Sequence, residues 1–100
     1  MNKKTIQLLK STPITIKWYN CDHWQKENYQ NLYDFVVDEG IKIKKNIVSL
    51  EMGTFKISYS YIDDKNLIRA LNKIILSYLV YMEDDAKLIT NNSITTIKRG

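Results

Sequence analysis

Residues 54–82 carry the strongest structural signal in the chain and read TFKISYSYIDDKNLIRALNKIILSYLVYM. Over the first eight of these residues polar and apolar side chains alternate, which is the pattern of a strand with one buried face. The apolar register consists of Phe55, Ile57, Tyr59 and Tyr61, and the polar register of Thr54, Lys56, Ser58 and Ser60. Because the first register is the only apolar one, we expect its side chains to face inward and Lys56 to face solvent.

The second part of this stretch predicts a long amphipathic helix that ends near residue 82. Asp63 and Asp64 supply an N-cap and negative charge at the helix start. Apolar residues then recur at spacings of three and four, namely Leu67, Ile68, Leu71, Ile74, Ile75, Tyr78, Leu79 and Met82. Further apolar residues widen this stripe, so we expect the helix to lie deep or to contact two surfaces. The same width would also support a homodimer.

Working back towards the N-terminus, residues 41–61 predict a hairpin with its turn at Met52-Gly53. The apolar register shifts by one residue within it, which predicts a bulge or a break near Lys45-Asn46. Residues 23–38 predict a helix that begins at a capping box of Asp22 and Gln25 and stops at Gly40.

Two further segments complete the predicted sheet. Residues 14–19 alternate as a half-buried strand does, and residues 88–90 and 94–98 predict short edge strands. The order is then strand, helix, hairpin, helix, strand. Two amphipathic helices on one face of a small antiparallel sheet would cover every apolar face. The sequence therefore predicts an α+β fold of ferredoxin-like βαββαβ order, in a single globular domain of residues 1–100.

This strand order resembles that of the RNA-recognition motif, which stacks bases on exposed aromatic side chains of its first and third strands. The corresponding segments here are residues 14–20 and 54–61. In the second segment the aromatic register is expected to face the helices, and the polar register offers no ring for stacking. The resemblance is one of topology, and no family assignment follows from it.

Composition and charge restrict the class of protein. The 100 residues are 44% hydrophobic and 26% charged, which is typical of a folded globular chain. The single cysteine, Cys21, excludes a disulfide scaffold and favours a cytoplasmic location. The N-terminal residues lack the apolar run of a signal peptide. The most apolar segment is interrupted by Arg69 and Lys73, so no membrane span is expected.

The sequence offers little support for catalysis. Cys21, Asp22 and His23 form the one cluster that resembles a thiol nucleophile with its base. We interpret Asp22 as a helix cap with two bystanders, and two ligands are too few for a zinc site. We therefore expect no catalytic residue, no cofactor and no metal. A Cys21-dependent enzyme is a third hypothesis, which unchanged function in a Cys21→Ser variant would eliminate.

The candidate binding residues lie on the outer face of the predicted sheet, and they are Lys17, Tyr19, Lys42, Lys44 and Lys56. A lysine-rich face with a tyrosine can bind an acidic partner protein or the phosphates of a nucleic acid. The alternative is a solvated face whose lysines keep edge strands from pairing with other chains.

We expect a small non-enzymatic protein that acts through protein–protein contacts. The net charge is +4, and 13 of the 15 basic residues are lysine, whereas base-specific recognition favours arginine. Ile, Lys, Asn and Tyr make up 43 residues, which indicates an AT-rich genome. We interpret the protein as an accessory factor of a phage or mobile element that inhibits a host enzyme or defence complex. The alternative is nucleic-acid binding by the lysine-rich face, largely without sequence specificity.

Overall fold

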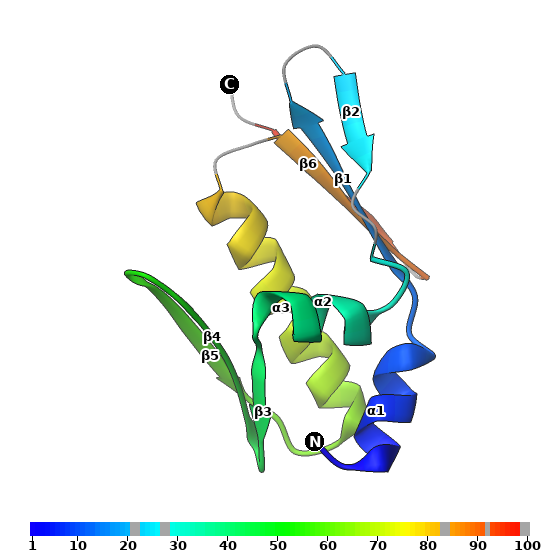
Figure 1. Ribbon diagram of the computed structural model, residues 1–100, viewed down its shortest axis with the longest axis vertical. Helices are drawn as coiled ribbons and strands as arrows, with labels where there is room; N and C mark the ends of the chain where they lie inside the picture. The colour runs from blue at the N-terminus through cyan, green and yellow to red at the C-terminus, as the bar shows by residue number, and fades with distance from the viewer. Residues whose placement is uncertain (21–22, 27–28, 83–84, 92, 99–100) are drawn as a thin grey trace.

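The chain adopts an α+β fold in which the longest helix lies between two antiparallel sheets (Figure 1). The structure is a computed structural model that describes residues 1–20, 23–26, 29–82, 85–91 and 93–98, and the side chains of 18–20 and 23–26 are outside this description. The elements in chain order are α1 (Lys3–Lys10), β1 (Ile14–Asn20), β2 (His23–Lys26), α2 (Leu32–Glu39), β3 (Lys42–Lys44), β4 (Ile47–Met52), β5 (Phe55–Ser60), α3 (Asp64–Tyr81), β6 (Asp85–Thr90) and β7 (Ile94–Ile97).

The predicted long helix is confirmed as α3. The Asp63 side chain caps it and accepts a hydrogen bond of 2.9 Å from the Asn66 N–H. Its buried residues are Leu67, Ala70, Leu71, Ile74, Ile75, Tyr78 and Leu79. They belong to one core that also contains residues of both sheets, so the expectation that this helix contacts two surfaces is confirmed.

The predicted hairpin is confirmed and extended by one strand. Met52 pairs with Phe55 across a two-residue turn at Gly53, whose φ of +57° is left-handed. The predicted break is the turn between β3 and β4, where Asn46 has a φ of +68°. The strands therefore form the three-stranded sheet β3-β4-β5, and the register shift of the sequence marks its first turn.

The expected orientation of β5 is also confirmed. Phe55, Ile57 and Tyr59 are half-buried and pack against the core, whereas Lys56 and Ser58 are exposed. The Phe55 ring lies 4.6 Å, between centroids, from the ring of Tyr81 on α3. The aromatic rings of β5 therefore pack towards the inside of the molecule, and the polar register of β5 forms its outer surface.

The predicted helix over residues 23–38 is wrong in its first part. His23–Lys26 form β2, which pairs with β1 in antiparallel register and supplies hydrogen-bond partners along that edge of β1. The helix α2 begins instead after Asn31, whose side chain accepts a hydrogen bond of 3.0 Å from the Asp34 N–H. It ends as predicted at Gly40, with a left-handed φ of +69°. The predicted cap Asp22 lies outside the described residues.

The ferredoxin-like order is not confirmed, because the strands form two sheets instead of one. The second sheet has the order β2-β1-β6-β7, so the predicted edge strand at residues 88–90 is part of the inner strand β6. The N-terminal residues, whose sequence pattern does not indicate a particular helix or strand, form α1. The physical reason for the second sheet is the wide apolar surface of α3, which one three-stranded sheet cannot cover.

Candidate functional site

The outer face of the β3-β4-β5 sheet gathers three of the five predicted binding residues. We call this surface the lysine face, and it consists of Lys42, Lys44, Ile47, Ser49, Glu51, Lys56, Ser58 and Ser60. The three lysines are exposed. Val48 and Leu50 alternate with these residues along β4 and are fully buried. Burial of the opposite register therefore fixes the lysine face towards solvent.

Strand pairing orders the lysine face into three rows. Lys44, Ile47 and Ser60 form the first row and Lys42, Ser49 and Ser58 the second. Glu51 and Lys56 form the third row, on β4 and β5. Neighbouring strands lie about 4.8 Å apart, so the side chains of one row are close enough together to contact the same chemical group of a binding partner.

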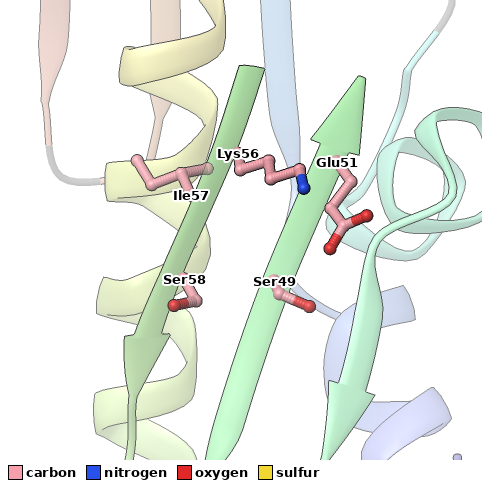
Figure 2. Close-up of a pocket in the computed structure, with 5 residues that line it drawn as sticks. All are labelled: Ser49, Glu51, Lys56, Ile57 and Ser58. Carbon is pink, nitrogen blue, oxygen red and sulfur yellow. The ribbon is translucent and has the colours of Figure 1, made fainter. Parts of the chain in front are cut away.

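Small serine side chains leave a shallow hollow between the longer ones. A cavity of about 140 Å³ is lined by Ser49, Glu51, Lys56, Ile57 and Ser58. Figure 2 shows the Lys56 side chain extended across β4 towards Glu51, while Ile57 points away from both. Substrate pockets usually enclose about 300–1,000 Å³, so this hollow accommodates a single side chain of a partner.

The hollow and its rim offer hydrogen-bond donors to an anionic group. Serine hydroxyls donate one hydrogen bond each, and each lysine ammonium group donates three. Lysine is a flexible point charge, so the face attracts carboxylates or phosphates without imposing the two-pronged geometry that arginine provides. Glu51 is the one negative group of the lysine face, and it disfavours a second anion in the third row.

The structure places the other two predicted residues, Lys17 and Tyr19, on a different sheet. Lys17 is exposed on β1, where its Cα pairs with those of Lys87 and Lys26 on the two flanking strands. Tyr19 pairs with Asp85 on β6, and its side chain is outside the described part of the structure. The expectation that all five residues share one sheet face is therefore wrong, because β1 does not join the β3-β4-β5 sheet.

A second group of basic residues was not singled out by the sequence analysis. Lys65, Arg69 and Lys73 are exposed along α3. Their spacing of four residues was the available signal, since it places side chains in one row along a helix.

Tyr29 contacts two carboxylates at the end of α2. Its hydroxyl donates to Asp38 Oδ2 at 2.6 Å and to Glu39 Oε1 at 2.8 Å. Burial, these two hydrogen bonds and the charges of both carboxylates all raise the pKa of Tyr29 above its ordinary value. The Phe35 ring packs edge-on against Tyr29 at 5.1 Å. This cluster stabilises the end of α2.

Among the described residues, no group of three His, Cys, Asp or Glu side chains could hold a metal ion. Cys21 and Asp22 lie outside those residues, as does the side chain of His23, so the interpretation of that cluster stays a prediction. Within the described ranges, α3 and the shorter helices lack the combination of length and apolar character that crossing a membrane requires.

Comparison with known proteins adds no relative. No protein-family model matches the chain, and no curated protein or solved structure matches it significantly. The functional interpretation consequently depends on the surfaces described above.

Proposed function

We propose that the protein is a non-enzymatic binding protein that holds an acidic surface of a partner protein against the lysine face. The observation that carries this proposal is the exposure of Lys42, Lys44 and Lys56 around three serines on one face of a sheet. Exposed charges of one sign steer a partner of opposite charge and fix its orientation. Serine hydroxyls between them can then accept or donate the short-range hydrogen bonds of an interface.

The composition of the lysine face favours a protein partner over a nucleic acid. Ile47 is 50% exposed and stands between Lys44 and Ser60, where an apolar group of a partner could cover it. Protein interfaces combine such apolar contacts with a polar rim. A phosphate backbone would gain nothing from Ile47. The rings of β5, which could stack on bases, face inward.

The proposal extends to the kind of partner. We propose an enzyme or a defence complex of a host cell, inhibited in the cytoplasm because the protein covers part of its surface. The support is the AT-rich composition of the sequence, which is typical of phages and mobile elements of low-GC bacteria. Covering a surface requires complementary shape and charge but no catalytic group.

A capture experiment with a charge-reversed lysine face tests the proposal. The immobilised protein and a Lys42→Glu/Lys44→Glu variant are exposed to nuclease-treated extracts of low-GC bacteria. A Lys3→Glu/Lys4→Glu variant on α1 has the same net charge and serves as the control. We expect the wild-type protein and the control to retain the same acidic protein, and the lysine-face variant to bind it at least about tenfold more weakly. Equal retention by all three proteins would contradict the proposal.

Salt dependence separates this function from the alternative, nucleic-acid binding by the same face. Phosphate binding weakens steeply with salt, by about one unit of slope in a log–log plot for each neutralised phosphate. A labelled duplex DNA that binds with such a slope, and that the lysine-face variant no longer binds, would favour the alternative. We expect instead no difference in DNA binding between the lysine-face variant and the α1 control.

A further inference from the structure

The exposed side of α3 carries a row of three basic residues, which we call the basic row: Lys65, Arg69 and Lys73. They lie one helical turn apart, at intervals of about 6 Å along the helix axis. All three are exposed. Beyond Asp64 in its first turn, α3 contains no acidic residue. The basic row is therefore a continuous line of positive charge on the solvent side of the central helix.

The basic row lowers the stability of the helix that carries it. Like charges four residues apart repel each other, whereas a carboxylate at the same spacing would attract. No acidic residue stands three or four positions from Lys65, Arg69 or Lys73. One compensating contact is described, in which the Lys73 Nζ lies 5.6 Å from the centroid of the Tyr59 ring. An anionic partner from outside the chain would relieve the repulsion along the whole row.

Tyr59 belongs to β5, whose second edge has no neighbouring strand among those described. In an antiparallel ladder, alternate residues direct their backbone groups to the same side. The Tyr61 N–H donates to the Asn46 carbonyl oxygen at 3.0 Å, so Tyr59 and Ile57 also direct theirs towards β4. The backbone groups of Lys56, Ser58 and Ser60 consequently point to the open edge, where a further strand could pair with them.

Burial across the sheet shows that the inner side of this edge is incompletely covered. Val48 and Leu50 on β4 are fully buried. Their cross-strand partners Tyr59 and Ile57 face the same way but are only half-buried. An additional strand would lie about 4.8 Å beyond β5 and would bury the remaining part of these side chains.

One end of the basic row lies beside the open edge, because the Lys73 Nζ lies over the inward-facing ring of Tyr59. The contact of Phe55 with Tyr81 shows that α3 runs antiparallel to β5, so Arg69 and Lys65 follow beyond Tyr59, towards and past the end of β5. A strand added to β5 would therefore direct an inward side chain towards Lys73, and its continuation past Ser60 would lead towards Arg69 and Lys65. Residues on one face of a strand repeat about every 6.7 Å, close to the interval of about 6 Å between the basic residues. Carboxylates at alternate positions of such a strand would match the basic row in both charge and spacing.

We propose that an extended acidic segment of the partner protein adds to β5 as a fourth strand, places a carboxylate on Lys73 and continues past Ser60 with alternate carboxylates towards Arg69 and Lys65. This inference depends on the proposed function in taking the partner to be an acidic protein, and it adds the mode of binding. The outward side chains of the segment would lie beside Lys56 of the lysine face. A nucleic acid could neutralise the basic row, but it has no peptide backbone to pair with the open edge.

A peptide experiment tests the charge match. The probe is a fluorescein-labelled peptide of eight residues in which glutamate and threonine alternate, and its binding to the full chain is followed by fluorescence anisotropy. We expect Arg69→Glu and Lys73→Glu each to weaken binding about tenfold, and Lys17→Glu on β1, an equal change in charge, to leave it within about twofold. A peptide that alternates lysine and threonine should not bind. Equal weakening by all three variants would overturn the proposal.

Backbone methylation tests strand addition separately from charge. Two further peptides are N-methylated at the threonines alone or at the glutamates alone, which blocks the amides of one edge of the strand and leaves the other edge free. We expect one of the two peptides to lose at least about tenfold in affinity and the other to bind nearly as well as the parent, since only one edge faces β5. Equal affinity of the two methylated peptides would overturn strand addition.

The following outcomes distinguish a failure of strand addition from a failure of the function proposed for the lysine face. If an eight-nucleotide thymidine strand binds more tightly than the peptide and responds to the same α3 variants, the basic row binds phosphates and the proposal is wrong. The peptide represents one segment of a partner, so its failure to bind overturns strand addition alone. Failure of the Lys42→Glu/Lys44→Glu variant to weaken capture would instead overturn the lysine-face function.

Discussion

Tyr29 illustrates how a single side chain joins separate parts of this molecule. Its hydroxyl donates to Asp38 and Glu39 at the end of α2. Glu39 also accepts a hydrogen bond of 3.4 Å from the Tyr78 hydroxyl on α3. The Phe35 ring packs edge-on against the rings of both tyrosines. The segment before α2, the end of α2 and the central helix are therefore held together by one aromatic and hydrogen-bonded cluster.

A pH titration of stability tests this contact. The folded pKa of Tyr29 is raised, so the stabilisation is complete below the unfolded pKa of about 10 and is lost as the pH rises above it. We expect Tyr29→Phe to lower the free energy of unfolding by about 1 kcal/mol at pH 7. Above pH 10 the difference between the two proteins should shrink, by at most about 1.4 kcal/mol per pH unit. Urea unfolding at several pH values measures it, and a difference that does not change up to pH 11 would contradict this role.

Sequence patterns predicted which way single side chains face better than they predicted which residues lie beside them. Alternation along β5 was sufficient to predict that Lys56 faces outward, because every aromatic ring of that strand lies in the opposite register. The same reasoning also placed Lys17 outward, and it is exposed. It could not reveal that Lys17 lies on another sheet than Lys42, since alternation determines the face of a strand and not the strand beside it.

At the scale of helices, the starting points depend on capping side chains. Asp63 was predicted as a cap because it precedes a long periodic pattern, and the structure confirms it. Asn31 was missed, although Asp34 follows three residues later, because an apparent capping box at Asp22 and Gln25 competed with it. When two local capping signals are equally strong, contacts with the rest of the chain decide which of them starts the helix. Here the deciding contact is the pairing of β2 with β1, which the sequence of residues 23–26 alone does not predict.

Substitution of the two adjacent aspartates separates capping from simple charge. Asp63→Ala removes the acceptor for the Asn66 N–H and should lower the free energy of unfolding by about 1 kcal/mol. Asp64→Ala removes the same charge one residue later, where it interacts with the helix dipole, and should cost a few tenths of a kcal/mol. Chemical denaturation of both variants provides the comparison. Equal losses would show that charge alone accounts for the start of α3.

At the scale of the whole molecule, α3 determines the arrangement of the two sheets. Its buried residues spread over about half of its circumference, and strands on either side complete the core (Figure 1). The sequence predicted a helix that lies deep or contacts two surfaces, and the structure places it between the two sheets. It did not predict a second sheet, because the division of strands between sheets depends on pairings between residues far apart in the chain, such as Ile14 with Thr90. The wide apolar stripe that suggested a homodimer is used largely inside the molecule.

Both proposed binding surfaces depend on the orientation of β5. With its rings inward, the lysine face lies outside and the open edge lies beside one end of the basic row. Nuclear Overhauser effects in solution report this orientation directly. We expect cross-peaks between the rings of Phe55 and Tyr81 and between the Tyr59 ring and the Lys73 side chain. If neither pair gives a cross-peak, and the Lys56 side chain shows contacts to α3 instead, then β5 is turned over and both surfaces are wrongly assigned.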